Sequence, residues 1–328
     1  MPTRIDPTAC GSSGSPISAH LRRVEHMISK ELGATGVFIP EIGIGTWEYH
    51  AGAHPLRQGL ETGALFVDTA ESYGTEEVVG EALVGIRDKV FLATKISPEH
   101  FRRDLLIRSA EACLRRLRVD NVDLLQLHQP NPSIPIEEPI GALTALVDAG
   151  KVRFIGVSNF SLQQLREAQA ASAKYPIVSN QLRYNIIDRT IEKDLLPYCQ
   201  ANRITIIAYS PLGRGLDRIR DCDPQQTIAR MMKETGRTAS QIVLNWCLCK
   251  EGIVVIPKGN SMSHILENCG ASDWRLSEKE LKLLDGSIRF RERTAFDGMV
   301  RRYMPSSMRT VALALLKYMP SSLRRRIT

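Results

Sequence analysis

Short apolar runs alternate with longer amphipathic segments along most of the chain. The runs have the length of buried strands and cover residues 41–46, 64–68, 90–95, 122–128, 152–157, 177–181, 204–210 and 253–257. The segments between them place apolar residues near helical spacing, as in residues 104–117. Strands that alternate with helices pair in parallel, and eight such units close a barrel. The pattern therefore predicts an α/β fold of the (β/α)8 TIM barrel type.

Three further helices are expected near the end of the barrel. Residues 224–235 and 240–250 form two helical patterns between the seventh and eighth strands, with a break at Gly236. A last helix over residues 277–284 starts with a capping box made by Ser277 and Glu280.

The chain divides into three parts on this pattern. Residues 1–36 are a polar, irregular N-terminal extension in which a short helix is allowed at residues 21–32. Residues 37–288 form the barrel, and residues 289–328 form a basic, amphipathic C-terminal tail with helical character. The chemistry is expected in the barrel.

The charge distribution argues against a nucleic-acid partner. The formal net charge is +7, but the residues from Arg289 onward include ten basic residues and only two acidic ones, Glu292 and Asp297. The rest of the chain is close to neutral, so its surface offers no site for a polyanion.

Cysteine usage and the apolar runs predict a cytoplasmic protein. The seven cysteines form no CxxC pair, residues 1–23 lack the apolar stretch of a secretory signal, and no run reaches the roughly 20 residues of a membrane span. His50 and His54 have no third ligand motif, so no metal is assigned.

Four polar residues lie where predicted buried strands end. Asp68 ends the second strand and Tyr73 follows in the loop, Lys95 ends the third strand, and His128 ends the fourth. The carboxyl ends of barrel strands carry the active site, so these side chains should converge. Each alone has an ordinary structural explanation as a cap or a turn residue. Together on adjacent strands they favour a catalytic site.

Their chemistry suits carbonyl reduction with Tyr73 as general acid. A phenol donates protons poorly near neutral pH, but a cation about 4 Å away, at an effective dielectric near 20, contributes roughly 4 kcal/mol, or about three pKa units. Lys95 would supply this cation and lower the pKa of Tyr73, while Asp68 would hold the ammonium. His128 would be a neutral donor that orients the substrate carbonyl.

Several segments resemble the aldo-keto reductase superfamily. They read GIGTW at residues 43–47, VDTAESYG at 67–74, GEAL at 80–83, IGVSNF at 155–160 and YSPLG at 209–213. The likeness covers roughly residues 39–284 and follows the order of the family motifs. It implies a (β/α)8 barrel, NADPH-dependent reduction of aldehydes and ketones, and a catalytic tetrad at Asp68, Tyr73, Lys95 and His128.

The same resemblance implies a set of cofactor-binding residues. Ser158, Asn159 and Gln181 match the residues that hold the carboxamide, and Tyr209 matches the ring that stacks on the nicotinamide. The helix near residue 162 offers a competing explanation for Ser158 and Asn159, as N-caps. The full expected set is Gly45, Thr46, Asp68, Ser158, Asn159, Gln181, Tyr209, Ser210, Pro211, Leu212, Gly213, Ile256, Lys258, Gly259, Asn260, Ser261, His264, Glu267 and Asn268.

The segment after the eighth strand departs from the family pattern for the 2′-phosphate of NADPH. The family has a hydroxyl residue after the lysine and an arginine six positions beyond it, where this chain has Gly259 and His264. Imidazole is a weaker and pH-dependent cation compared with guanidinium, so a lower phosphate affinity is expected. NADPH remains the leading cofactor, and NADH stays open.

The substrate pocket is expected to include Trp47, Tyr73, His128 and Gln129. The family often has Trp after the catalytic His, so Gln129 makes one wall polar. A broad range of small carbonyl compounds is the default substrate class. A cofactor-sensing regulatory subunit with little turnover is the main alternative, and an aldolase that uses Lys95 as a Schiff base is a more distant one.

The basic tail suggests a contact with an anionic membrane surface, and the alternative is a helix that packs against the barrel or a partner subunit. The segment YMPSSMR at residues 303–309 recurs as YMPSSLR at residues 318–324, and residues 311–316 between them are apolar. Basic residues near an anionic surface contribute up to about 1 kcal/mol each.

Deletion of residues 301–328 should therefore weaken binding to anionic liposomes, measured by co-sedimentation. Unchanged binding would eliminate the membrane hypothesis.

Overall fold

The computed structural model describes residues 27–290. Residues 291–328 of the expected C-terminal tail and residues 1–26 of the expected N-terminal extension lie outside this range. Within residues 27–290, no helix is long and apolar enough to cross a membrane.

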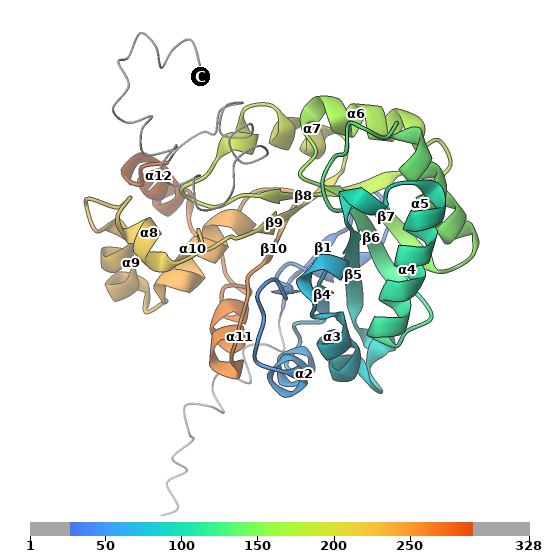
Figure 1. Ribbon diagram of the computed structural model, residues 1–328. Coiled ribbons are helices and arrows are strands. Elements are labelled where there is room, and N and C mark those ends of the chain that lie inside the picture. Colours follow the sequence, from blue (N-terminus) through green and yellow to red (C-terminus); the bar gives the residue numbers. More distant parts are fainter. Residues whose placement is uncertain (1–26, 291–328) are drawn as a thin grey trace, which may run out of the picture.

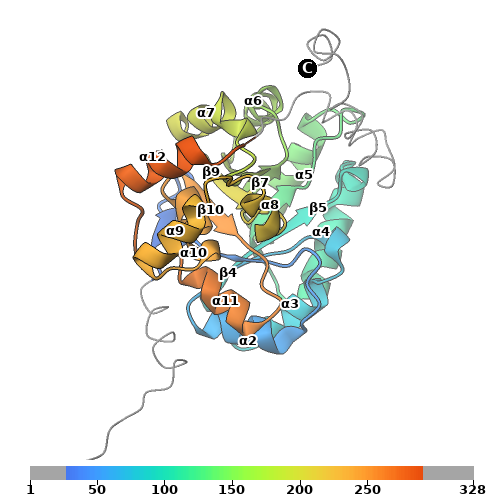
Figure 2. The same cartoon turned by 90° about the vertical axis from the view of Figure 1, so that its left-hand side faces the viewer.

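Eight parallel strands form the centre of the molecule, with helices arranged around them (Figures 1 and 2). The strands follow one another around the sheet in chain order. Each strand pairs with the next one in the chain, and a βα connection joins the two. All eight predicted strands are present, which confirms the (β/α)8 barrel. They are β3 (Ile44–Gly45), β4 (Phe66–Asp68), β5 (Phe91–Ile96), β6 (Val122–Leu127), β7 (Val152–Ser158), β8 (Ile177–Arg183), β9 (Thr205–Tyr209) and β10 (Ile253–Ile256).

Backbone contacts between the first and last strands close the barrel. Ile42 forms a parallel bridge with Val255, and the N–H of Gly43 donates to the carbonyl of Val255 at 2.8 Å. The N–H of Gly45 donates to the carbonyl of Pro257 at 3.1 Å. A Cβ at Gly45 would lie 2.7 Å from the carbonyl oxygen of Ile256, so this closure requires glycine.

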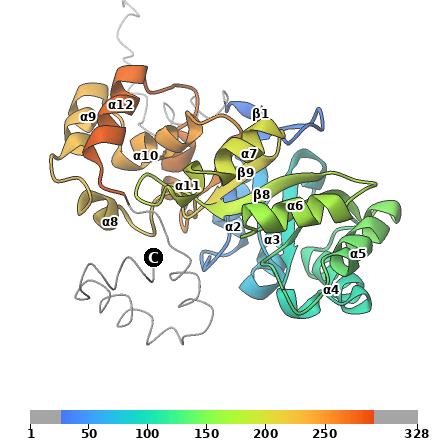
Figure 3. The ribbon, with the colours of Figure 1, turned by 90° about the horizontal axis from the view of Figure 1, so that it is seen from above.

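The helices cover the outside of the barrel, and Figure 3 shows α8, α9, α10 and α12 grouped on the side away from α4 and α5. The predicted break at Gly236 separates α9 from α10, and Ser277 and Glu280 form the predicted capping box of α12. The helices are α2 (Ala53–Glu61), α3 (Glu76–Leu83), α4 (Arg103–Leu117), α5 (Glu137–Asp148), α6 (Leu162–Ala171), α7 (Leu195–Ala201), α8 (Leu216–Arg220), α9 (Thr227–Thr235), α10 (Ala239–Leu248), α11 (Met262–Cys269) and α12 (Glu278–Ser287), with the 3₁₀ turns η1 (Glu71–Tyr73), η2 (Arg87–Lys89), η3 (Pro98–His100) and η4 (Thr190–Glu192).

Two apolar clusters hold these layers together. The larger one lies between the strands and the helices, as expected for parallel strands covered on the outside. The smaller one fills the barrel interior and includes Phe66, Leu124, Ile207 and Val254. Because the interior is packed with side chains, a site can form only at an end of the barrel.

An antiparallel hairpin precedes the barrel, and here the sequence prediction was wrong. Strand β1 (Ser29–Glu31) pairs with β2 (Phe38–Pro40), in place of the end of the helix allowed at residues 21–32. Leu32 and Ile39 are fully buried and belong to the interior cluster. Lys30 also donates to the carbonyls of Leu248 and Ile253. The hairpin therefore spans the expected domain boundary at residue 36 and packs on the barrel. The three-part division of the chain stays a prediction.

Candidate active site

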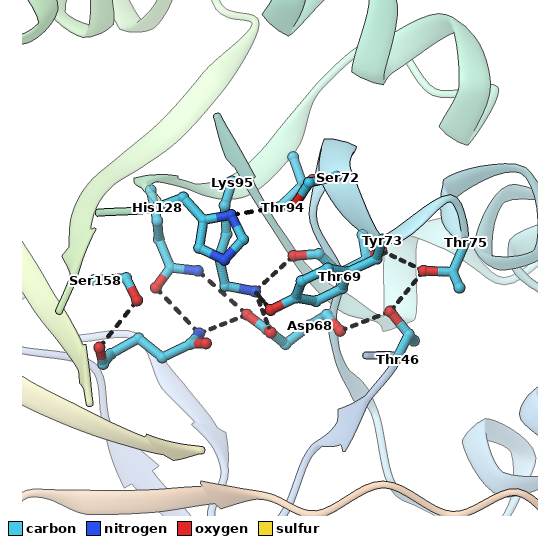
Figure 4. A network of polar contacts seen from close by, with 12 residues as sticks. Thr46, Asp68, Thr69, Ser72, Tyr73, Thr75, Thr94, Lys95, His128 and Ser158 are labelled. Atoms are coloured by element: carbon cyan, nitrogen blue, oxygen red, sulfur yellow. Dashed lines mark hydrogen bonds and ion pairs between the residues drawn. The ribbon is translucent and has the colours of Figure 1, made fainter. Parts of the chain in front are cut away.

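The four predicted catalytic side chains meet at the carboxyl ends of three adjacent strands (Figure 4). Asp68 is the last residue of β4, Lys95 lies next to the end of β5, and His128 directly follows β6. Tyr73 ends the single turn η1, which follows β4. Parallel pairing of β4 with β5 and of β5 with β6 brings these ends to one edge of the barrel.

Lys95 is the centre of this group. Its side chain is fully buried, and its Nζ lies 2.5 Å from Oδ1 of Asp68 and donates to the carbonyl of Thr69 at 2.7 Å. The third contact of Nζ is the Tyr73 hydroxyl at 3.4 Å. A buried ammonium is costly unless it is paired and hydrogen-bonded, and here each of its three donors has an oxygen. The pair of Lys95 and Tyr73 is therefore fixed in place.

The pKa values of this pair follow from burial and from the charges nearby. Burial alone would lower the pKa of Lys95, but the charge and hydrogen bonds of Asp68 and Tyr73 raise it above its ordinary value. Burial raises the pKa of Tyr73, and the opposing effect of Lys95 does not overcome it. The expected net decrease in the Tyr73 pKa was wrong, because desolvation of the phenolate outweighs the cation. Tyr73 is thus a protonated phenol at neutral pH.

His128 is neutral at neutral pH, because its pKa lies below the ordinary value. Burial, followed by the charge of Lys95, lowers its pKa to about 4. Its Nδ1 lies 3.5 Å from the hydroxyl of Ser72, and its ring meets the Tyr73 ring edge to face with centroids 5.5 Å apart. The neutral imidazole and the phenol therefore face the same space.

The second carboxylate oxygen of Asp68 is held by two amides. Gln181 donates to Oδ2 at 2.7 Å and Gln126 donates at 3.2 Å, and Gln181 also donates to the Oε1 of Gln126 at 3.3 Å. Gln126 is fully buried and was not predicted from the sequence. It was detectable as a polar residue in an apolar strand, two positions before His128 and so on the same face.

Asn159 links the neighbouring strand ends. Its amide nitrogen donates at 3.0 Å both to the carbonyl of His128 and to the hydroxyl of Ser158, and its oxygen accepts from the Tyr209 hydroxyl at 2.9 Å. Ser161 forms the capping box of α6 with Gln164. Neither Ser158 nor Asn159 is therefore needed to cap this helix, and both lie at the cleft.

The site opens into a cleft of about 1130 Å³ at this end of the barrel. Lys95 lies behind Tyr73 and does not line the cleft. Four of the expected cofactor residues do not line it either, namely Gly213, Gly259, Asn260 and Ser261. The predicted residues that line it are Gly45, Thr46, Trp47, Asp68, Tyr73, His128, Gln129, Ser158, Asn159, Gln181, Tyr209, Ser210, Pro211, Leu212, Ile256, Lys258, His264, Glu267 and Asn268.

Some residues that line the cleft were not predicted. Arg214 lies between Gly213 and Gly215 and itself has a positive φ of 67°. Its guanidinium carbon lies over the Trp47 ring, 4.8 Å from the ring centroid. A basic residue flanked by glycines after a strand end was the available signal. The others not predicted are Glu48, Ser72, Leu216, Arg218, Ser240 and Pro257.

The far end of the cleft carries the segment that departs from the family pattern. Lys258 donates to the carbonyl of Glu48 at 3.1 Å, and Ser261 caps α11 by accepting from the N–H of His264. The His264 side chain is exposed at the rim. A Cβ at Gly259 would lie 2.6 Å from Cγ1 of Ile265, so glycine there is required by packing.

The chain belongs to the aldo-keto reductases. Residues 41–289 match the model of the "Aldo/keto reductase family". Among curated proteins, the "Methylglyoxal reductase YeaE" of Escherichia coli (strain K12) is 36% identical over 260 residues, which cover 76% of this chain and 91% of that protein. The "Aldo-keto reductase YhdN" of Bacillus subtilis (strain 168) is 38% identical over 205 residues, 56% of this chain and 61% of that protein.

Solved structures agree with this assignment. The thermostable aldo-keto reductase Tm1743, crystallised with the inhibitor epalrestat, is 41% identical with a TM-score of 0.74, and the match covers 79% of this chain and 99% of that one. An aldo-keto reductase from Klebsiella pneumoniae in complex with NADPH is 36% identical with a TM-score of 0.75, over 81% of this chain and 98% of that one.

The low pKa of His128 has a measurable consequence. Its imidazole should stay neutral from pH 8 to pH 5 and become protonated only near pH 4. Since the pKa in the folded protein lies below the ordinary 6.5, this group's contribution to the free energy of unfolding is present above about pH 6.5 and is lost as the pH falls toward 4. An NMR titration of the imidazole nitrogens, assigned with His128→Gln, measures this directly. Protonation near pH 6.5 would contradict the prediction.

Proposed function

We propose that this protein is an NADPH-dependent reductase of small aldehydes and ketones. The observation that carries the proposal is the position of the Tyr73 hydroxyl, 3.4 Å from the buried ammonium of Lys95 and beside a neutral His128 at the head of the cleft. Family membership supports the reaction class, and the NADPH complex of the Klebsiella pneumoniae relative supports the cofactor.

The side chains at the strand ends are suited to a nicotinamide. Ser158, Asn159 and Gln181 offer amide and hydroxyl groups that can pair with both ends of a carboxamide. The Tyr209 ring lines the same part of the cleft and is the proposed stacking surface. Gly45, Thr46, Asp68 and Ile256 line the adjoining wall. NADPH bound there supplies the hydride.

The rest of the cleft is suited to the remainder of the dinucleotide. The loop from Ser210 to Gly213 is the proposed site of the pyrophosphate, where the glycine permits close approach of the backbone. Lys258 and His264 line the cleft and are the proposed 2′-phosphate contacts, with Asn260, Ser261 and the backbone of Gly259 as flanking groups outside its lining. Glu267 and Asn268 are the proposed partners of the adenine amino group.

The proton transfer follows from the tetrad. The neutral His128 orients the carbonyl by donating a hydrogen bond to its oxygen, and Tyr73 donates its proton to the same oxygen as negative charge develops there. The ammonium of Lys95 then stabilises the phenolate. Asp68, held by Gln126 and Gln181, keeps the ammonium in position.

Two other assignments have less support. An aldolase would need Lys95 as a free amine, but its Nζ is buried, ion-paired and has a raised pKa. A cofactor-sensing subunit would use the same cleft, so only turnover separates it from a reductase. The intact tetrad favours catalysis.

The pocket beside the tetrad favours small substrates of mixed polarity. Trp47 and Gln129 line it together with Tyr73 and His128, which gives an aromatic wall and a polar one. One relative is named a methylglyoxal reductase, which supports small dicarbonyl compounds as a substrate class. A peripheral contact made by the basic tail also stays a proposal, and it rests on the sequence of residues 289–328.

Replacement of the general acid tests the mechanism. Tyr73→Phe should lower aldehyde-dependent NADPH oxidation by about 10²-fold or more while leaving the Kd for NADPH nearly unchanged, because only the proton donor is removed. Turnover is measured by loss of NADPH absorbance with a panel that includes glyoxals, and Kd by fluorescence titration. Tyr175→Phe, a tyrosine on the protein surface bonded to Asp148, serves as the control. Full turnover in Tyr73→Phe would refute the mechanism, and wild-type binding without turnover would favour the sensing subunit.

Replacement of His264 tests the proposed phosphate site. His264→Arg should tighten NADPH binding by on the order of tenfold, because a guanidinium is charged at all accessible pH values and can bind a phosphate with two hydrogen bonds. The Kd for NADH should stay the same, since NADH lacks the 2′-phosphate. An equal change for both cofactors would show that residue 264 does not contact that phosphate.

A further inference from the structure

A second cavity lies behind the turn that carries Tyr73. It has a volume of about 720 Å³, and its lining residues come from η1, the loop after β5, and α3 and α4. Ser72 lines both this cavity and the active-site cleft. The turn η1 is therefore the wall between the two spaces, and whatever holds η1 from behind also affects the position of Tyr73.

Glu71, the first residue of η1, is attached to the elements on the far side of this wall. Its carboxylate accepts hydrogen bonds from the backbone N–H of Ser97 and from the hydroxyl of Ser109. The Nδ1 of His100 lies 3.1 Å from the same carboxylate and 3.2 Å from the Ser109 hydroxyl. The side chain of Glu71 is only 7% exposed, and both of its oxygens accept hydrogen bonds.

One of these contacts joins the two segments that carry the proton-donating pair. Ser97 follows Lys95 by two residues, and Glu71 precedes Tyr73 by two. The segments are thus linked twice, by Tyr73 and Lys95 on the cleft side and by Glu71 and Ser97 on the cavity side. Two links on opposite sides of a turn restrict its rotation, whereas one link would act as a hinge.

The geometry of a 3₁₀ turn makes this link important. Such a turn has three residues per revolution, so successive side chains point in three directions. Glu71 contacts the loop after β5 and α4, Ser72 faces His128, and Tyr73 faces Lys95 (Figure 4 shows the last two). The turn is too short to be stiff by itself. Its orientation depends on these three side chains. Among them, Glu71 is charged and accepts hydrogen bonds from several donors.

The ionisation of Glu71 is consistent with this arrangement. Burial alone would raise its pKa, but the hydrogen bonds from Ser109, Ser97 and His100 together lower it below the ordinary value. The carboxylate is therefore charged at neutral pH and accepts all of these bonds at once.

We propose that Glu71 is a positioning residue for Tyr73: by binding Ser97 and Ser109 it holds η1 so that the phenol stays beside Lys95. The inference rests on the proposed role of Tyr73 as general acid. Glu71 does not line the cleft and acts only through the turn.

Three substitutions of Glu71 distinguish the effect of its charge from the effect of where its acceptor oxygens lie. Glu71→Leu removes both acceptors at similar size, Glu71→Asp keeps the charge but shortens the reach, and Glu71→Gln keeps the reach and one acceptor oxygen. Displacement of a reacting group by about 1 Å can cost up to about 10²-fold in rate. We expect the kcat of the Leu and Asp variants to fall by about 10- to 100-fold, and the Gln variant to retain most of its turnover.

The pattern of constants distinguishes positioning from loss of structure. KM and the Kd for NADPH should stay within about threefold of wild type, because a positioning residue affects the transition state and not cofactor binding. The solvent isotope effect on kcat should increase in Glu71→Leu, since proton transfer becomes slower. Glu77→Leu, an exposed acid at the same cavity, is the matched control and should behave as wild type.

Hydrogen exchange gives a second measurement that needs no activity. The segment of residues 69–75 should exchange faster in Glu71→Leu than in Glu77→Leu, while the barrel strands exchange equally. The inference is overturned if Glu71→Leu matches the control in kcat and exchange. It is also overturned if kcat, NADPH affinity and strand protection all fall together, or if the Gln variant is as impaired as the Leu variant.

The two levels of the proposal can fail separately. Normal turnover in Tyr73→Phe would refute the general acid and with it the catalytic consequence assigned to Glu71. If instead Tyr73→Phe is impaired and Glu71→Leu is not, only the positioning role fails. In an inactive wild-type protein, unchanged exchange of residues 69–75 in Glu71→Leu would still refute the anchor.

Discussion

The buried ion pair of Lys95 and Asp68 is the interaction on which the site depends. Removing two charges from water costs several kcal/mol for each ion, and the cost is offset only when every donor and acceptor finds a partner. Here the partners come from different strands: Thr69 and Tyr73 follow β4, Gln126 lies on β6 and Gln181 on β8. The requirement to satisfy one charged pair therefore fixes the relative positions of several strand ends, and the site is rigid as a result.

Much of the barrel could be predicted because it depends on local patterns. Apolar runs of strand length and amphipathic segments set the eight βα units, and Ser277 with Glu280 marked the start of α12. The hairpin of β1 and β2 could not be predicted in this way. Its short strands are stabilised by burial of Leu32 and Ile39 against the barrel interior, which is a long-range interaction that local periodicity does not contain.

The convergence of the four predicted side chains was also predictable, since they lie at or just after strand ends, but their electrostatics were not. The sign of the Tyr73 pKa shift depends on how much desolvation opposes the charge of Lys95, and the sequence shows only the charge. Gln126 and Arg214 were missed for a related reason. Polar residues in strands and loops are common, and only their neighbours reveal what they contact.

The close packing of Gly259 against Ile265 limits how this cleft can change during evolution. The Cβ of a hydroxyl residue at position 259 would lie only 2.6 Å from Cγ1 of Ile265, which is too close. Such a change requires a smaller residue at position 265 first, or a shift of the start of α11. The two positions are therefore coupled: a larger residue at position 259 fits only together with a change at position 265 or in the backbone of α11. Position 264 is exposed and carries no such packing constraint.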